Sequence, residues 1–306
     1  MTAMTAPIEV LAPAKVNLFL HVIGRRDDGY HLLQSPFELI DWADRLTLDH
    51  RPDGQIVRTG DLCSAVEDDL AYRAARLLQT TAAWQAQGCP GAEINVVKAI
   101  PSGAGLGGGS SDAASTLMGL NRLWGLGLGR AELSALGLRL GADVPFFLFG
   151  QAAFAEGVGE ALTPYEASPR WLAVVVPACT VPTAAIFQAP ELTRNSKPLK
   201  IAGFAQAARN PIWEFGHNDL EPVTRARFPL VDQAARWLGE AAAREGIAPV
   251  AVRMSGSGSA VFCTAPDADT CQRILDHVTA CQKSAPDTIA HLRRCKTLVA
   301  HPERVF

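Results

Sequence analysis

The chain has 306 residues, a formal net charge of −3 and a hydrophobic content of 48%. This length is enough for two domains, or for one large domain, with an ample core. Because the balance of charge is slightly acidic and lysine and arginine form no block, we expect neither a nucleic-acid partner nor an anionic-membrane partner.

Seven cysteines are scattered along the sequence without any C-x-x-C pair. An odd, dispersed set is typical of reduced structural thiols rather than of a disulfide framework. Residues 1–7 hold no basic segment and no long apolar core, so we expect no signal peptide and a cytoplasmic location. An uncharged run at residues 171–189 approaches membrane-spanning length, but Pro177 and Pro182 favour a buried strand, a turn and a short helix.

In chain order, the first hundred residues are predicted to be mostly strands with one long helix. Apolar patterning predicts strands at residues 8–11, 16–23, 37–40 and 45–49. It predicts an amphipathic helix at 68–87, whose apolar residues fall on one face.

Two polar side chains stand in the apolar surroundings of the second strand. Lys15 lies just before it and Asn17 lies within it. Burying either without a partner is costly, about 1–3 kcal/mol for the amide alone. The sequence leaves two alternatives open, a buried partner or a strand-end lysine that reaches solvent.

Tyr30 and His31 follow a turn at residues 25–29. A loop that presents these two side chains together can stack a planar ring and hydrogen-bond its edge. Half-buried surface is the alternative interpretation, and the residues alone do not decide between them.

A glycine-rich segment follows the apolar residues 94–97 and runs directly into an alanine-rich stretch. Its residues are Pro101, Ser102, Gly103, Ala104, Gly105, Leu106, Gly107, Gly108, Gly109, Ser110, Ser111 and Asp112. Glycine tolerates positive φ, so successive N–H groups can turn toward one point. A following helix adds its free N–H groups and the positive end of its dipole. Ser110, Ser111 and Asp112 are favourable N-cap types, so the pattern predicts a strand, an anion-binding loop and a helix.

The two familiar glycine fingerprints fit this segment poorly. A P-loop needs a lysine after its last glycine, whereas Gly109 is followed by two serines. The spacing of Gly103, Gly105 and Gly108 matches a dinucleotide-binding loop, but about a hundred residues precede it, and such a loop normally follows the first strand. A flexible surface loop is the remaining alternative, which the capped, alanine-rich continuation disfavours.

The middle of the chain contains one isolated charge. After a predicted helix at 131–140, Asp143 is the only charged residue between Arg139 and Glu156. It either caps the next helical turn or is held for chemistry, and these two interpretations are compatible. Strands are predicted at 151–155 and 171–176, and the chain is divided near residue 160.

The last part of the chain again alternates strands and helices. A helix is predicted to begin near residues 182–183, residues 191–211 are irregular to helical, and 218–245 is largely helical. A second glycine loop at 254–259 joins strands at 250–252 and 260–262. It is either a hairpin turn or a second set of backbone donors. A helix at 271–281 and a closing strand at 297–300 complete an α+β pattern in both halves.

Three segments, at residues 13–17, 101–112 and 254–258, resemble in order and spacing the three motifs of the small-molecule kinases related to galactokinase, homoserine kinase and mevalonate kinase. The resemblance implies an α+β, two-domain kinase. Its N-terminal ATP-binding and catalytic domain would span 1–160 and its C-terminal substrate-binding domain 161–306.

Residues 28–31, 105–112 and 141–147 narrow the resemblance. They are similar to members that use ATP to phosphorylate the C2 hydroxyl of an erythritol carrying a cytidine diphosphate group, in the non-mevalonate route to isoprenoids. The rival interpretations are a homoserine or mevalonate kinase of the same superfamily, and a nucleotide-binding regulator that has lost the chemistry.

The resemblance also implies roles for single residues. Asp143 would accept the proton of the substrate hydroxyl, while Lys15 would hold that aspartate and stabilise charge on the transferred phosphoryl group. The loop at 101–112 would bind the ATP phosphates, with Mg²⁺ bridging the β- and γ-phosphates and Ser110 or Ser111 as a possible ligand.

On the substrate side, the resemblance implies that Tyr30 and Phe187 sandwich the cytosine ring and that His31 reads its edge. Asn17 and Thr183 would contact the rest of the substrate. Asp69 stands where the family favours asparagine, which leaves the contact to adenine open. No oligomeric state follows from these residues.

Overall fold

The computed structural model describes residues 6–200, 215–248 and 251–303. The strands are β1 (Ile8–Asn17), β2 (His21–Arg25), β3 (His31–Arg51), β4 (Ile56–Gly60), β5 (Gly91–Val97), β6 (Ala153–Glu156), β7 (Ala161–Pro164), β8 (Trp171–Pro177), β9 (Val252–Met254), β10 (Val261–Ala265) and β11 (Ile289–Leu298). The α-helices are α1 (Leu70–Leu78), α2 (Ala82–Ala86), α3 (Gly108–Leu123), α4 (Arg130–Leu138), α5 (Val144–Phe149), α6 (Thr183–Phe187), α8 (Glu221–Arg227), α9 (Pro229–Arg244) and α10 (Ala268–Gln282).

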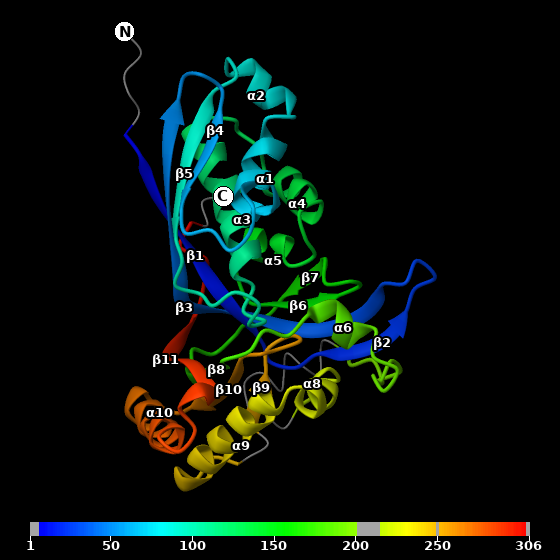
Figure 1. Cartoon of the computed structure of the whole chain (residues 1–306). Coiled ribbons are helices and arrows are strands. Elements are labelled where there is room, and N and C mark those ends of the chain that lie inside the picture. The colour runs from blue at the N-terminus through cyan, green and yellow to red at the C-terminus, as the bar shows by residue number, and fades with distance from the viewer. Residues whose placement is uncertain (1–5, 201–214, 249–250, 304–306) are drawn as a thin grey trace.

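One sheet passes through the whole described structure. Its path runs β4-β5-β3-β11-β8-β10-β9, and β1, β2 and β6 join it along β3. Helices α1 to α5 gather at the β4-β5-β3 end, and α9 and α10 lie at the β8-β10-β9 end (Figure 1). The alternating strands and helices confirm the predicted α+β class.

The long strand β3 organises the first half of the sheet. The separate strands predicted at 37–40 and 45–49 are one strand, because the alternation of buried and exposed residues continues through residues 41–44. Strand β1 is likewise continuous through Pro13, and the chain leaves it only after Asn17. Pro13 is tolerated because the pairing of β1 with β3 shifts register between Pro13 and Ala14.

Two predicted helices are each divided in two. The helix predicted at 68–87 becomes α1 and α2, because Thr81 accepts a hydrogen bond from the N–H of Trp84 and so caps a new helix. The helix predicted at 218–245 becomes α8 and α9, with Pro229 at the first position of α9.

Other boundaries differ from the prediction in smaller ways. The closing strand begins at Ile289, eight residues before the predicted start, and β9 begins at Val252. The described part of the irregular region, residues 191–200, contains no helix. The rest of that prediction, and residue 250 of the predicted strand at 250–252, lie outside the described residues. The run at 171–189 forms β8 and α6, as predicted, and no described helix is long and apolar enough to cross a membrane.

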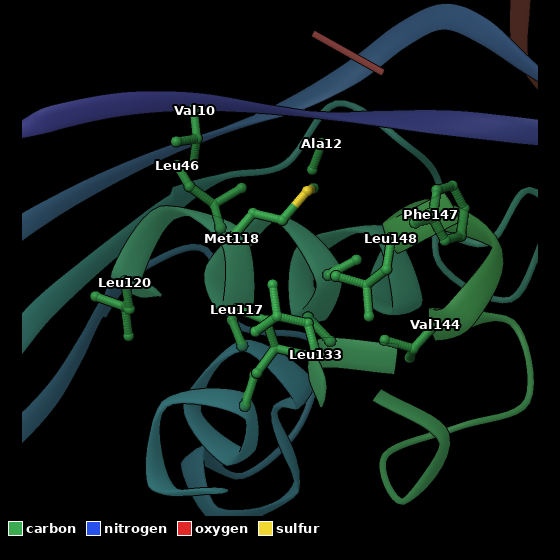
Figure 2. Close-up of a cluster of buried hydrophobic side chains, with 14 of the residues drawn as sticks. Val10, Ala12, Leu46, Leu117, Met118, Leu120, Leu133, Val144, Phe147 and Leu148 are labelled. Carbon is green, nitrogen blue, oxygen red and sulfur yellow. The ribbon is translucent and has the colours of Figure 1, made fainter. Parts of the chain in front are cut away.

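Three buried clusters fill the space between these layers. The first lies between the sheet and helices α1, α3, α4 and α5. Figure 2 shows Leu117 and Met118 of α3 packed between strands that carry Val10 and Leu46 and the helix that carries Leu133. The second cluster lies under α9 and α10. The third combines β1, the glycine loop, β8 and β10. It therefore joins the two halves, and the division at residue 160 stays a prediction.

We predict that Leu48→Ala lowers the free energy of unfolding by about 2–5 kcal/mol, because it removes a fully buried side chain between β3 and α3. Leu48 packs so tightly that a Cβ on Gly119 would lie 2.4 Å from its Cδ1. Urea denaturation measures the loss. Leu138→Ala, at a side chain that is 45% exposed, is the control and should change stability by about 0.5 kcal/mol or less. Equal losses in the two variants would contradict this packing argument.

Candidate active site

A cavity of about 970 Å³ is lined by residues from both halves of the chain. Its wall is formed by β1, the glycine loop, the start of α5, the β2–β3 hairpin and α6, together with residues 256 and 257. Every residue that the sequence predicted for the site lines this cavity except Ser111 and Asp112. The structure therefore brings together segments that are far apart in the sequence.

The glycine loop connects β5 to α3, as predicted. Gly103, Gly105 and Gly107 have φ values of +68°, +75° and +74°, which L side chains rarely adopt. Helix α3 begins at Gly108 with Gly107 as its N-cap, so the prediction that Ser110, Ser111 or Asp112 caps it is wrong. The first N–H groups of a helix have no partner within it. Those of α3 lie at the cavity wall, where the dipole favours an anion.

Both glycine loops and β1 meet through their backbones. The N–H of Lys15 donates to the carbonyl of Leu106 at 2.9 Å, and the N–H of Ala260 donates to the carbonyl of Ala104 at 3.0 Å. The hydroxyl of Ser255 donates to the carbonyl of Gly105 at 2.8 Å. A Cβ on Gly105 would lie 2.2 Å from the carbonyl oxygen of Ser255, so only glycine allows this approach.

Lys15 is buried and has polar partners on its own strand and on α5. Its Nζ donates to Oδ1 of Asn17 at 2.6 Å and lies 3.5 Å from Oδ2 of Asp143. The Nδ2 of Asn17 donates to Ser35 at 2.8 Å. Of the two alternatives that the sequence left open for Lys15, the structure shows the buried partner. Asn17 lines the cavity while its side chain positions Lys15.

Asp143 occupies the N-cap position of α5, but its side chain makes no capping hydrogen bond. Its carboxylate faces Lys15, and the side chain remains 34% exposed in the cavity. Asp143 therefore stands at the cap position without capping the helix through its side chain, and its role in chemistry stays a prediction.

Ser111 and Asp112 do not line the cavity, and their side chains instead bond to neighbouring segments. The hydroxyl of Ser111 donates to the carbonyl of Pro13 at 2.7 Å. Asp112 pairs with Lys98 at 2.6 Å, and Lys98 also pairs with Asp44. Burial raises the pKa of Asp112 to about 7, because Asp44 adds to the effect of burial while Lys98 only partly opposes it. Burial lowers the pKa of Lys98, but the two aspartates raise it more, so the lysine keeps its charge.

The part of the cavity formed by the β2–β3 hairpin and α6 is lined by aromatic and imidazole side chains, and is called the ring end below. Tyr30 follows the β2–β3 turn and is 65% exposed, whereas His31 packs on Phe187 with ring centroids 5.1 Å apart. Thr183 shares a hydrogen bond of 2.7 Å with Ser257. His31, rather than Tyr30, therefore contacts Phe187 in this structure.

Asp69 lies outside the cavity wall. It caps α1 by accepting from the N–H of Tyr72 and pairs with the buried Arg58 at 3.2 Å. The structure thus gives this departure from the family pattern a role in holding α1, and the contact to adenine stays open.

Lys98, Arg25, Leu70, Gly256 and Ser257 also line the cavity and were not predicted as site residues. For Lys98 the signal was a charge three residues before Pro101, at the end of β5. For residues 256 and 257 it was the second glycine loop itself. Nothing in the local sequence of Arg25 or Leu70 points to the cavity.

The described residues contain no group of three or more histidine, cysteine, aspartate or glutamate side chains that could hold a metal ion. The oxygen donors beside the start of α3 include Ser110 and Asp143, which both line the cavity. The hydroxyl of Ser110 lies near the segment before Asp143, since a Cβ on Gly141 would be 3.9 Å from it. This set fits a hard cation that is bound mainly by phosphate oxygens and water.

Comparisons with known proteins agree with this geometry. Residues 69–151 match the GHMP kinases N terminal domain, and residues 201–283 match the GHMP kinases C terminal domain. The 4-diphosphocytidyl-2-C-methyl-D-erythritol kinase of Methylibium petroleiphilum is 52% identical over 302 residues, 98% of each chain. That of Thiobacillus denitrificans is 53% identical over 281 residues, 91% of each chain.

Solved structures give the same result. A crystal structure of 4-(cytidine 5'-diphospho)-2C-methyl-D-erythritol kinase matches with a TM-score of 0.75 and 35% identity, covering 95% of this chain and 99% of that one. Homoserine kinase from Cytophaga hutchinsonii matches with a TM-score of 0.69 and 17% identity, covering 98% and 97%. The second likeness shows the fold alone.

We predict that Gly107→Val abolishes measurable ATP binding in a folded protein. Valine is strained at φ +74°, and its Cβ would lie 2.8 Å from the ring of Phe147 and 3.2 Å from Cε of Lys15. Isothermal titration calorimetry measures binding, and thermal unfolding checks the fold.

Gly125→Val is the matched control for this variant. Gly125 has φ +62°, and a Cβ there would have no other atom within 4 Å, so valine adds backbone strain without closing the loop. This variant should bind ATP normally. Normal ATP affinity in folded Gly107→Val would contradict the role of the loop.

Proposed function

The chain belongs to the 4-diphosphocytidyl-2-C-methyl-D-erythritol kinase family of the GHMP kinases, and on this premise we propose how its cavity works. It is a kinase with ATP as co-substrate. The acceptor is the C2 hydroxyl of 4-diphosphocytidyl-2-C-methyl-D-erythritol, and the products are the 2-phosphate and ADP. The reaction belongs to non-mevalonate isoprenoid synthesis.

The observation that carries the proposal is the pair of Lys15 and Asp143 beside the glycine loop. Their charged atoms are 3.5 Å apart, and both residues line the cavity with the start of α3. Phosphoryl transfer depends mainly on positioning and on stabilisation of charge, so the three features together supply what this reaction requires.

Asp143 acts as the general base. Its carboxylate is partly exposed in the cavity and makes no capping bond, so a substrate hydroxyl can reach it. As the hydroxyl oxygen attacks the γ-phosphorus, its proton passes to the carboxylate. A positioned base of this kind contributes about 10²–10⁴-fold to the rate.

Lys15 has two functions. Its ammonium holds the carboxylate of Asp143, and the ammonium itself donates a hydrogen bond to Asn17, which fixes its position. The same positive charge stabilises the charge on the transferred phosphoryl group. The hydrogen bond from the N–H of Lys15 to Leu106 ties this charge to the phosphate loop.

Ser110 would be the protein ligand of Mg²⁺, because it lines the cavity whereas the hydroxyl of Ser111 donates to the carbonyl of Pro13. When bound, the ion would neutralise charge on the phosphates. The loop itself binds the phosphates through backbone N–H groups.

The ring end of the cavity supports a substrate that carries a base. Tyr30, His31 and Phe187 lie in the same cavity as the catalytic pair, with Thr183 between them and the second glycine loop. Stacking together with hydrogen bonds to the edge is a general way of binding a base. Homoserine and mevalonate carry no base and would leave these side chains without a partner.

The direct test is an assay of ADP release with Mg-ATP and three alcohols. We expect turnover with 4-diphosphocytidyl-2-C-methyl-D-erythritol and none with homoserine or mevalonate. Turnover with homoserine or mevalonate instead would overturn the substrate assignment. ATP binding without ADP release from any of the three would favour the silent regulator.

We predict that Asp143→Asn lowers kcat at least ~100-fold while the Kd for ATP stays nearly unchanged, because the amide cannot accept the proton. Asp53→Asn is the matched control, since Asp53 pairs with Arg51 away from the cavity wall. The ADP assay and calorimetry give the two quantities. Turnover at the wild-type rate in Asp143→Asn would show that another group is the base.

A further inference from the structure

Arg194 lies behind His31, and its guanidinium bonds both to the backbone around α6 and to the imidazole. We propose that Arg194 fixes the tautomer of His31, so that the histidine presents an N–H donor to the cavity and selects cytosine over uracil. This inference rests on the proposed function, because it concerns how the same cavity chooses its base.

The guanidinium is held by three backbone carbonyls. Its Nη1 donates to Leu192 at 3.0 Å, and its Nη2 donates to Phe187 at 3.0 Å and to Ala189 at 2.7 Å. Phe187 is the last residue of α6, and Ala189 and Leu192 follow it, so the rigid, planar arginine fork ties the end of this helix to the segment after it. The orientation of Nε is therefore set by the backbone.

Of the two N–H donors that these carbonyls leave, Nε–H points at His31. It lies 3.1 Å from Nε2 of the imidazole. Arginine has no acceptor and stays protonated, so Nε2 must offer its lone pair. In a neutral imidazole the proton then resides on Nδ1. Among the described residues, Nδ1 of His31 has no hydrogen-bond partner, and His31 lines the cavity.

The imidazole is also kept neutral and in place. Burial, followed by the nearby charges of Arg194 and Arg25, lowers the pKa of His31. Its ring packs on Phe187 at 5.1 Å with an interplanar angle of 32°. The backbone carbonyl of that phenylalanine is itself bonded to Arg194. One arginine thus positions both the stacking ring and the edge-reading ring.

A fixed N–H donor distinguishes the two pyrimidines. On the Watson–Crick edge, N3 of cytosine is an acceptor, whereas N3 of uracil carries a proton. An N–H donor on Nδ1 forms a hydrogen bond with N3 of cytosine, but it faces the N3–H donor of uracil. Opposed donors are left unpaired and desolvated, which is an effective means of rejection. A freely exchanging tautomer would accept both bases.

The test compares CDP and UDP as competitive inhibitors against the cytidylyl substrate at saturating ATP. For the wild-type enzyme we expect the inhibition constant of UDP to be at least ~10-fold that of CDP. Arg194→Met should bring the ratio close to one and raise KM for the cytidylyl substrate, with kcat and the Kd for ATP unchanged. A general loosening of the fold would change these last two quantities as well.

Arg227→Met is the matched control. Arg227 also touches this region, through the carbonyl of Ala185 and the carboxylate of Glu191, but it makes no contact with His31. It should keep the preference for CDP. If Arg194→Met keeps the preference too, or if both variants lose it equally, the inference is wrong.

A direct readout comes from ¹⁵N correlation spectra of the histidine side chains in the wild-type enzyme, where His31→Gln identifies the signal. We expect a protonated Nδ1 and an unprotonated Nε2, and a shift of this balance in Arg194→Met. A proton on Nε2 in the wild-type protein would overturn the inference even if the variant did not fold.

The outcomes separate this inference from the proposed function. Turnover of the cytidylyl substrate without discrimination between CDP and UDP would refute the tautomer argument alone. No turnover and no inhibition by CDP would refute the proposed function itself.

Discussion

The close backbone approach of the two glycine loops is the constraint on which the rest of this site depends. Gly105 meets the carbonyl of Ser255 at a distance that leaves no space for a Cβ, and Ser255 returns a hydrogen bond to the carbonyl of Gly105. Ser255 also lies near Asn17, whose N–H donates to its hydroxyl at 3.3 Å. A larger residue at 105 would separate the loops and, with them, the strand that carries Lys15.

Buried charge holds the same loop from its other side. One oxygen of Asp44 accepts from the N–H groups of Ala99 and Ile100 at 2.6 and 2.8 Å, and the other pairs with Lys98. Lys98 in turn pairs with Asp112 inside α3. Both ends of the loop are therefore fastened to one buried cluster. A buried pair of this kind adds little net stability but is costly to break, which suits a segment whose geometry must not vary.

The glycine loop and the elements on either side of it could be predicted because they depend on residues that are close together in the sequence. The glycines needed positive φ, the strand before them was apolar and the helix after them was rich in alanine, so the loop was predictable. The charges of Lys15 and Asp143 in apolar surroundings drew attention to both residues, but the sequence left open whether Lys15 has a buried partner or reaches solvent. Contacts between residues far apart in the sequence could not be predicted. The cluster of Asp44, Lys98 and Asp112, for example, joins three separate segments. Asp112 was instead predicted as a candidate for the N-cap of α3, a position that Gly107 occupies. Helix breaks at Thr81 and Pro229 were missed because apolar periodicity continues across them.

The two ends of the cavity are built on different physical principles, and this has a consequence for specificity. Under the proposed function, the phosphates would meet backbone N–H groups of a loop in which Gly103, Gly105 and Gly107 have positive φ and leave no space for a Cβ. Most substitutions at these glycines would therefore disturb the fold of the site before they altered its preference. The ring end uses side chains on a hairpin and on a short helix, which Arg194 holds through carbonyls that any residue supplies. Exchanging His31 or Phe187 leaves those carbonyls in place. Preference for the acceptor can thus change at the ring end while the geometry of phosphoryl transfer is retained.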